Sequence, residues 1–412
     1  MVQDNNRRMK DSGIPWIGMI PSDWEVCFTK QLMRNKSIKG FPDEQVLSLY
    51  RDYGVVPKNS RDDNHNVTSE DTATYKLVEV GDFVINKMKA WQGSMAISAY
   101  RGIISPAYYI CRFTNESVNR RYIHYLLRNE TYKTEYRRLS TGLRVGQWDL
   151  NIDDFLHIPA ILPPLPTQQH IADFLDRKCA EIDELAALQE TMIAELKRYK
   201  QSVITETVTK GLGPNVPMKD SGVEWIGEIP SAWRTIRLKF LCTIQTGNQD
   251  TQDAIADGEY PFYVRSPLVE HSNKFSFEGE GILMAGDGAG AGRVFHHVFG
   301  KYAVHQRVYR LANFTSIHSD YLFYFLSSLF CKEMDRGSAQ STVPSVRLPM
   351  LQNFCICIST TAEQRAIADY LDRKCAEIDE LIAIKQQKIE ALKEYKKSVI
   401  FEYVTGKKEV EG

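Results

Sequence analysis

The sequence predicts an α+β fold with two mixed, β-rich domains, each followed by one long α-helix. Two internal repeats predict this arrangement. The stretch 168–209 returns as 364–405 at an offset of 196 residues, and the stretch 9–24 returns as 218–233 at an offset of 209. With 412 residues the chain is long enough for two or more domains, and its 43% apolar and 25% charged residues are an ordinary soluble composition. The repeating unit is therefore a signature, a globular domain and a long helix, used twice.

The signature reads Lys-Asp-Ser-Gly-x-x-Trp-Ile-Gly-x-Ile-Pro-x-x-Trp in both copies, from Lys10 to Trp24 and from Lys219 to Trp233. Because the two offsets differ by 13 residues, the segment between signature and helix is shorter in the second half. The globular domains therefore diverge while their flanks repeat.

Within each globular segment, short apolar runs broken by Gly, Pro, Asn and Asp predict strands. The first domain has such runs at 45–50, 76–80, 82–87 and 107–113, followed by a predicted helix at 120–139. The second has them at 260–264, 281–285, 293–298 and 304–311, followed by a predicted helix at 320–334.

The first long repeat carries apolar residues in steps of three and four, which is the spacing of one helix face. These residues are Ile171, Leu175, Cys179, Ile182, Leu185, Leu188, Met192, Leu196, Tyr199 and Val203. A stripe so narrow, flanked by charged residues, needs a partner, and the other copy supplies one in a two-helix coiled coil. Two separate amphipathic helices, each lying on its own domain, are the alternative.

These patterns divide the chain into six parts. They are a first domain at 1–166, a helix at 167–211, a Gly/Pro linker at 212–217, a second domain at 218–362, a helix at 363–406 and a tail at 407–412. No apolar run reaches the length of a membrane span, and the polar N-terminus has no signal-peptide core. We expect a cytoplasmic protein that does not bind membranes.

A search for catalytic motifs finds none that fits. The chain has no Asp/Asn-Pro-Pro-Tyr methyltransferase loop, no phosphate-binding loop of ATPases and no Cys-x-x-Cys pair. Asp176-x-Lys178 and its copy Asp372-x-Lys374 match part of a nuclease motif, but they lie on the long helices. The loop Gly286–Gly292 precedes a predicted strand, whereas a dinucleotide-binding loop opens a helix. It is either a structural turn or a close approach to a ligand.

Side chains suited to DNA gather in both domains, although the net charge is only −1. The segment 86–92 places Asn, Lys and Gln, which read base edges, on a strand-to-turn stretch. In the second domain, similar chemistry is offered by Arg265, Arg293, His305, Gln306 and Arg307.

The doubled signature resembles that of the DNA specificity subunit of type I restriction-modification systems. In each copy it precedes a variable domain and then Gln-x-x-Ile-Ala-Asp-Phe/Tyr-Leu-Asp-Arg-Lys, beginning at Gln168 and Gln364. The family's usual Glu-Gln at the helix entry is kept at Glu363, while Thr167 replaces the glutamate in the first copy.

The resemblance implies two target recognition domains, each reading half of a bipartite site on double-stranded DNA, held apart by an antiparallel coiled coil. The local two-fold axis of duplex DNA independently favours antiparallel helices. The resemblance further implies two adenine methyltransferase subunits and two ATP-driven restriction subunits as partners. It implies no catalytic centre, metal or cofactor in this subunit, because S-adenosylmethionine, ATP and Mg²⁺ would serve the partners.

The resemblance also implies a recognition face in each domain. Its candidate DNA-binding residues are Lys87, Lys89, Trp91, Gln92, Arg144 and Gln147 in the first domain, and Arg265, Asp287, Arg293, His305 and Arg307 in the second. The alternatives are a two-domain coiled-coil scaffold that binds proteins and a fused methyltransferase-nuclease fragment. Purification with and without methyltransferase subunits, and a test of methyl transfer, would separate the three.

Overall fold

The computed structural model describes residues 7–51, 53–60, 72–142, 148–337 and 344–410. The chain divides into two compact units, Met1–Gln189 with Gln387–Gly412, and Glu190–Gln386. Each unit contains one globular domain, the first part of the long helix that follows this domain, and the last part of the other long helix. The α+β class, with two β-rich domains and two long helices, is confirmed.

The long helices are α4 (Leu165–Lys210) and α7 (Thr361–Val404). Pro166 lies in the first turn of α4, where a backbone N–H would have no partner within the helix. After α4, Gly211 adopts a φ of 77°, the left-handed conformation that ends many helices. With 46 residues, α4 is about 69 Å long at about 1.5 Å per residue.

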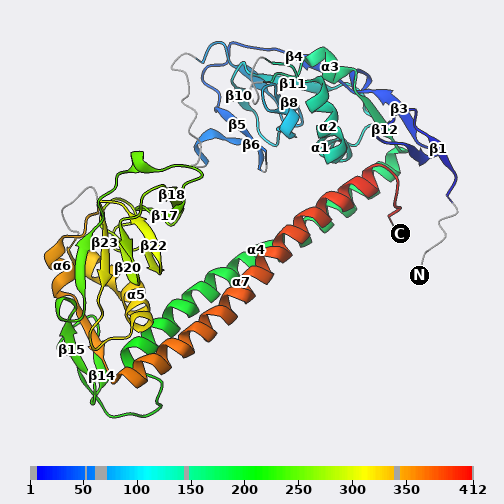
Figure 1. Cartoon of the computed structure of the whole chain (residues 1–412). Helices are drawn as coiled ribbons and strands as arrows, with labels where there is room; N and C mark the ends of the chain where they lie inside the picture. The colour runs from blue at the N-terminus through cyan, green and yellow to red at the C-terminus, as the bar shows by residue number, and fades with distance from the viewer. Residues whose placement is uncertain (1–6, 52, 61–71, 143–147, 338–343, 411–412) are drawn as a thin grey trace. The chain divides into compact units, whose positions relative to one another are not determined.

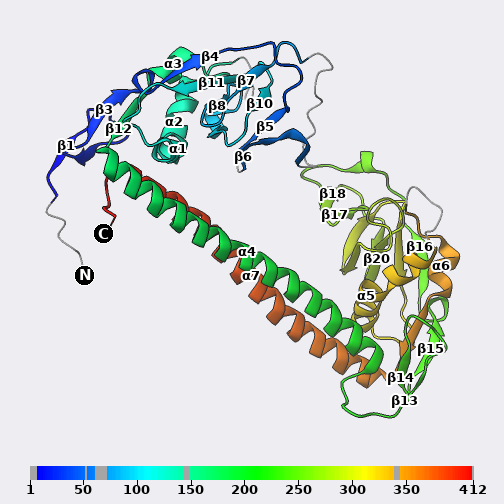
Figure 2. The same ribbon diagram turned by 180° about the vertical axis from the view of Figure 1, so that it is seen from behind.

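The two helices pair in the same way within each unit (Figures 1 and 2). In the first unit Lys396 Nζ lies 2.7 Å from Asp183, and in the second Lys200 Nζ lies 2.6 Å from Asp379. These are the same two repeat positions with the copies exchanged. Within each unit the start of one helix therefore meets the end of the other, as in an antiparallel coiled coil.

Domain 1, the globular part before α4, is built on an antiparallel sheet in the order β4-β11-β8-β9. Its strands are β4 (Met33–Lys36), β11 (Tyr108–Phe113), β8 (Phe83–Asn86) and β9 (Met95–Ile97). Two further pairs are β5 (Leu47–Tyr50) with β6 (Gly54–Pro57), and β7 (Lys76–Val78) with β10 (Gly102–Ile104).

The helices of domain 1 are α1 (Arg120–Arg128), α2 (Glu130–Leu139) and α3 (Ile152–Leu156). The prediction of one helix at 120–139 is wrong at its middle. The side chain of Asn129 accepts the backbone N–H groups of Thr131 and Tyr132 and thereby starts a new helix.

Domain 2, between α4 and α7, repeats the sheet in the order β16-β23-β20-β21. Its strands are β16 (Thr243–Thr246), β23 (Val308–Ala312), β20 (Gly281–Ala285) and β21 (Phe295–Val298). A second sheet contains β18 (Val269–Ser272), β17 (Tyr260–Tyr263), β22 (Lys301–Val304) and β19 (Phe277–Glu278). The predicted strand at 304–311 is wrong in its first half, because residues 305–307 turn the chain from β22 into β23, whereas residues 308–311 do lie in β23.

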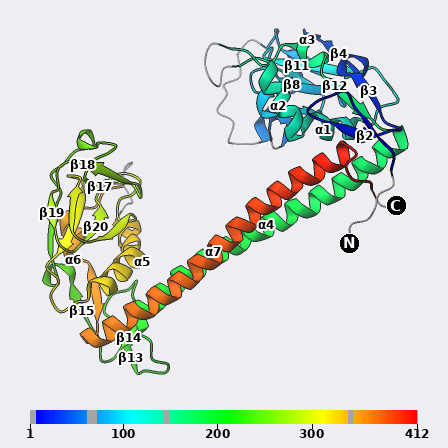
Figure 3. The ribbon, with the colours of Figure 1, turned by 45° about the vertical axis from the view of Figure 1, so that its right-hand side comes forward.

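The helices of domain 2 are α5 (Ser319–Gly337) and α6 (Leu348–Asn353). Figure 3 shows α5 beside β20, and Phe325 and Leu329 of α5 share a buried cluster with Ile282 of that strand. Short 3₁₀ turns complete both domains: η1 (Thr29–Gln31), η2 (Lys58–Ser60), η3 (Ala90–Gln92), η4 (Leu238–Phe240) and η5 (Thr251–Asp253).

The two signatures fold alike. They form the hairpins β1 (Met9–Asp11) with β2 (Met19–Pro21), and β13 (Met218–Asp220) with β14 (Glu228–Pro230). In both, the aspartate accepts a backbone N–H at 2.9 Å, Asp11 from Gly13 and Asp220 from Gly222. The next strands pair with the strand that enters the long helix: β3 (Glu25–Phe28) with β12 (Pro159–Leu162), and β15 (Arg234–Arg237) with β24 (Cys355–Ile358).

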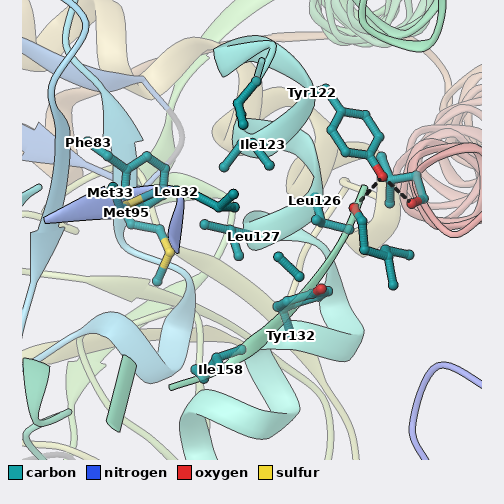
Figure 4. Packing of buried hydrophobic residues seen from close by; sticks show 14 of the residues in the cluster. Leu32, Met33, Phe83, Met95, Tyr122, Ile123, Leu126, Leu127, Tyr132 and Ile158 are labelled. Carbon is teal, nitrogen blue, oxygen red and sulfur yellow. Dashed lines mark hydrogen bonds between the residues drawn. The ribbon is translucent and has the colours of Figure 1, made fainter. Parts of the chain in front are cut away.

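One buried tyrosine in each domain contacts the last turn of the incoming helix. The Tyr122 hydroxyl lies 3.0 Å from the carbonyl oxygens of Ile161 and Val404 (Figure 4). The Tyr321 hydroxyl lies 2.8 Å from the carbonyl oxygen of Val208 and 2.7 Å from that of Cys357. Because the last carbonyls of a helix have no partner within it, each tyrosine ties a helix end to its domain.

No helix within the described residues is both long and apolar enough to cross a membrane.

Candidate nucleic-acid interface

Two loops occupy the same place in the two sheets. Loop 1 (87–94) joins β8 to β9, and loop 2 (286–294) joins the equivalent strands β20 and β21. At the start of loop 1 the N–H of Lys87 donates to the carbonyl of Ala107 at 3.3 Å, and in loop 2 the N–H of Gly286 donates to that of Arg307 at 2.8 Å. The Lys/Trp/Gln stretch and the Gly-rich loop are thus counterparts, which their sequences do not show.

Loop 1 carries exposed positive charge. Lys89 is exposed, and Lys87, one third exposed, lies 3.4 Å from the carboxylate of Asp149. Burial lowers the pKa of Lys76, and the nearby charges of Lys39 and Lys87 lower it further. Lys76 and Lys39 thus add positive charge near Lys87, and positive charge is the sign that attracts a polyanion such as DNA.

Trp91 is packed within domain 1. Its indole N–H donates to the carbonyl of Met88 at 3.1 Å, its ring centroid lies 5.5 Å from that of Trp148, and Arg137 lies over it at 5.6 Å. Because the ring is partly buried by these contacts, Trp91 supports the shape of loop 1. Gln92 next to it is also half-buried. Arg144 and Gln147, the other two candidates, lie outside the described residues.

Loop 2 places one carboxylate between two arginines. Asp287 Oδ1 lies 3.1 Å from Arg265 and its Oδ2 lies 3.7 Å from Arg307. The arginine side chains are 45% and 66% exposed, and the aspartate is 24% exposed. The structure thus brings three of the predicted residues, from three separate segments, into one cluster on the surface of domain 2.

His305 lies beneath this cluster, with only 3% of its side chain exposed. Its Nδ1 accepts the backbone N–H of Arg307 at 2.9 Å, so the proton of the neutral ring is on Nε2, which lies 3.4 Å from Asp250 Oδ1. Burial lowers the pKa of His305, and the charge of Arg265 lowers it further. His305 is thus a neutral support for the backbone of Arg307.

Arg293 is the exposed residue at the end of loop 2. The segment after it is the strand β21, as the sequence predicts, so loop 2 does not present a helix N-terminus to a dinucleotide.

The aspartates of the partial nuclease motif, Asp176 and Asp372, have a structural role. Asp176 accepts the hydroxyl of Tyr125 at 2.8 Å, and its copy Asp372 accepts that of Tyr324 at 2.6 Å. Each aspartate therefore ties a long helix to its domain. Among the described residues, no three His, Cys, Asp or Glu side chains are grouped to hold a metal ion.

Only part of the predicted helix stripe is buried. Ile171, Leu175, Cys179 and Ile182 are buried, whereas Leu185, Leu188, Met192 and Tyr199 are 38–52% exposed. The copies in α7 behave alike, with Leu381, Ile384 and Tyr395 48–52% exposed. The expectation that the two helices bury the whole stripe against each other is wrong for these positions.

Sequence reasoning missed the partners of the predicted residues. Asp149 pairs with Lys87, and Asp250 lies beside His305 and accepts the side-chain amide of Gln306 at 2.9 Å. Both lie more than 50 residues from their partners. A single sequence carries no signal for such contacts.

Comparison with known families gives a match over most of the chain. The model described as "Type I restriction modification DNA specificity domain" matches residues 21–198 and 230–394.

Curated relatives give consistent matches. The MjaVIII specificity subunit of Methanocaldococcus jannaschii is 25% identical over 94% of this chain and 93% of its own length. The EcoDI specificity subunit of Escherichia coli is 28% identical over 42% of this chain and 38% of its own length.

Solved structures share the fold. A chain from a study of complex assembly in a type I R-M system aligns with a TM-score of 0.71 at 15% identity, over 93% of this chain and 98% of that one. The HsdS subunit of Thermoanaerobacter tengcongensis aligns with a TM-score of 0.51 at 15% identity, over 94% and 98%.

Proposed function

Since this chain belongs to the type I restriction modification DNA specificity family and is a specificity subunit, we propose that it recognises a bipartite DNA target. Domain 1 reads one half-site and domain 2 reads the other. The prediction of a specificity subunit is confirmed by the family match and the names of its relatives, and the proposal assigns catalysis to its partners.

One observation carries the proposal. The two domains have the same four-stranded sheet order, yet loops 1 and 2, at the same place in those sheets, share no residue pattern. A frame that repeats while its loops differ suits two readers of different sequences, because binding residues concentrate on loops held by a rigid scaffold.

The loop residues supply the chemistry. Lys87, Lys89 and Gln92 in loop 1, and Arg265, Arg293 and Arg307 in domain 2, carry the donors that meet base edges in the major groove or phosphate oxygens. Trp91 and His305 support these loops. Asp287 positions the arginines.

The net charge of −1 is low for a protein that binds DNA alone, because affinity for DNA comes largely from neutralised phosphates. We therefore assign much of the phosphate contact to partner subunits, two methyltransferase and two restriction subunits in the full complex. In this proposal, S-adenosylmethionine, ATP and Mg²⁺ are bound and used by those subunits.

The exposed apolar residues of the helices suit the methyltransferase subunits. In the first unit Leu185 and Leu188 of α4 and Tyr395 of α7 are about half exposed, and in the second unit so are their copies, Leu381 and Ile384 of α7 and Tyr199 of α4. Because the surface occurs twice, it fits two copies of one partner.

The test is an exchange of residues 25–158 for the equivalent segment of a relative, expressed with the methyltransferase subunits. Genome-wide mapping of methylated adenines should show one half-site replaced and the other kept. A simultaneous change of both half-sites would contradict the assignment of one half-site to each domain. If the purified chain binds the methyltransferase subunits but directs no methylation, a protein-binding scaffold would be favoured instead.

A further inference from the structure

The glycines of loop 2 have a defined role in its arginine cluster. A Cβ atom at Gly286 would lie 2.8 Å from the carbonyl oxygen of Arg307, and one at Gly290 would collide with the carbonyl oxygen of Arg265. Only glycine therefore allows the loop backbone to lie against both segments that carry the arginines. Asp287 follows Gly286 directly and so reaches both guanidinium groups.

The carboxylate in the cluster distinguishes a base from a phosphate as the ligand. A phosphate would be drawn to two arginines alone, but Asp287, 3.1 and 3.7 Å from them, would repel its negative charge. The major-groove edge of guanine is uncharged and offers two acceptors, O6 and N7, which a guanidinium can meet with two parallel hydrogen bonds. Asp287 therefore favours a guanine edge over the DNA backbone.

Arg307 is the arginine best placed for this contact. It faces Asp287 through Nε, so the edge formed by its two terminal nitrogens is not needed for the ion pair, and its side chain is 66% exposed. Arg265 faces Asp287 through a terminal nitrogen and is 45% exposed. The backbone N–H of Arg307 is in turn held by His305 at 2.9 Å.

From this geometry we infer that domain 2 reads a guanine in its half-site, with Arg307 contacting O6 and N7 and Asp287 as the positioning residue. This inference rests on the proposed function, in which domain 2 reads one half-site. It adds the identity of one base and of the residue that reads it.

The first measurement is the methylation motif of the full chain with its methyltransferase subunits, with the half-site of domain 2 assigned by segment exchange. A bipartite motif whose domain 2 half contains a fixed G·C pair agrees with the inference. A bipartite motif with no fixed G·C pair in that half overturns the inference and leaves the proposed function intact. Absence of any sequence-specific methylation would instead overturn the proposed function.

The second measurement is binding of the same complex to duplexes in which each fixed guanine of that half-site is replaced in turn by 7-deazaguanine, which lacks the N7 acceptor. One such replacement should weaken binding by the wild-type complex but not weaken further the binding of the Arg307→Ala complex. Independent losses from the replacement and from Arg307→Ala would overturn the contact.

Two conservative substitutions change the side chains less than Arg307→Ala does, so they test the same contact with less risk that the protein misfolds. Arg307→Lys keeps the charge but cannot form two parallel bonds, so discrimination should fall roughly 5- to 150-fold, the equivalent of about 1–3 kcal/mol. Asp287→Asn should raise binding to scrambled DNA and steepen its salt dependence by about one phosphate contact. Arg234→Ala, at an exposed position of β15, serves as the control. Equal losses on cognate and scrambled DNA for Arg307→Lys would make Arg307 a phosphate contact and overturn the inference.

Discussion

Domain 1 and domain 2 share one frame, which consists of the signature hairpin, the four-stranded sheet and the contacts with the long helices. They fix loop 1 and loop 2 by different contacts. Loop 1 has a 3₁₀ turn, η3, whose Trp91 packs on Trp148 and Arg137. Loop 2 has no large side chain at the equivalent place and is held by glycine backbone and the Asp287 ion pairs. The same sheet thus supports a loop fixed by aromatic packing and a loop fixed by close backbone approach.

The difference shows which contacts belong to the frame. Each domain has the tyrosine that meets a helix end, the aspartate that starts the signature turn and the lysine-aspartate pair between helices. None of these contacts involves loop 1 or loop 2. We therefore expect changes in the frame to affect stability in both domains alike, and changes in the loops to affect only one half-site.

The largest expected effect is on the frame. Tyr122→Ala and Tyr321→Ala should each lower the free energy of unfolding of their unit by about 3–5 kcal/mol, because each removes a fully buried ring. The Phe variants, which lose only the hydroxyl, should cost about 1–3 kcal/mol by leaving a buried carbonyl unpaired. Urea unfolding with hydrogen exchange at the end of α7 for Tyr122, and of α4 for Tyr321, measures both.

The matched pairs make this test of the frame strict. If only one tyrosine affects its helix end, the two frames are not energetically equivalent, even though their hydrogen bonds correspond. Arg138→Ala in domain 1, an exposed residue paired with Glu135 on its own helix, should change stability little, because such surface pairs contribute little.

The next effect is on the loops. Lys87→Ala should reduce discrimination at the half-site of domain 1, and Arg293→Ala at that of domain 2, each by about 1–3 kcal/mol if the side chain bonds a base. Binding of the complex with methyltransferase subunits is measured on duplexes with neither, one or the other half-site scrambled. Scrambling the half-site that a variant no longer reads should then cost less than in the wild type.

Equal weakening on all duplexes would make these residues phosphate contacts. Unchanged affinity would remove them from the interface. An effect of Lys87→Ala on the half-site of domain 2 would break the separation of the two loops.

The two sequence repeats were enough to predict the frame, because each repeated element is determined by residues that lie close together in the sequence. The stripe from Ile171 to Ile182 and the Lys-Asp-Ser-Gly turn are set by residues close in sequence. The break at Asn129 was missed because an N-cap in the middle of an apolar pattern competes with helix continuation, and the outcome depends on tertiary packing.

The site was predicted less completely. Lys87, Arg265 and Arg307 were proposed by residue type and stay predictions, but the pairing of Asp287 with two arginines, which the structure shows, joins segments about 20 residues apart. The support given by Trp91 and His305 could not be predicted, because it depends on burial that a periodic pattern does not encode. The exposed half of the helix stripe was missed for the same reason.

The smallest expected effect concerns a hydrogen bond of the signature tryptophan that differs between the two domains. In domain 2 the indole N–H of the signature tryptophan, Trp233, donates to the carboxylate of Glu363 at 3.1 Å. In domain 1 the equivalent Trp24 is fully buried, and its N–H has no hydrogen-bond partner. The difference follows from the sequence, because Thr167 occupies the position of Glu363 at the offset of 196 residues.

Exchanging these two residues should therefore have opposite effects. Thr167→Glu should stabilise the first unit by about 0.5–1.5 kcal/mol, the net value of one hydrogen bond. Glu363→Thr should destabilise the second by about 1–3 kcal/mol, because it leaves a buried donor unpaired. Urea unfolding of both variants and of the double variant measures the effects. A loss of stability on Thr167→Glu would mean that domain 1 has adapted its packing to the threonine, and the frames would then differ in more than one hydrogen bond.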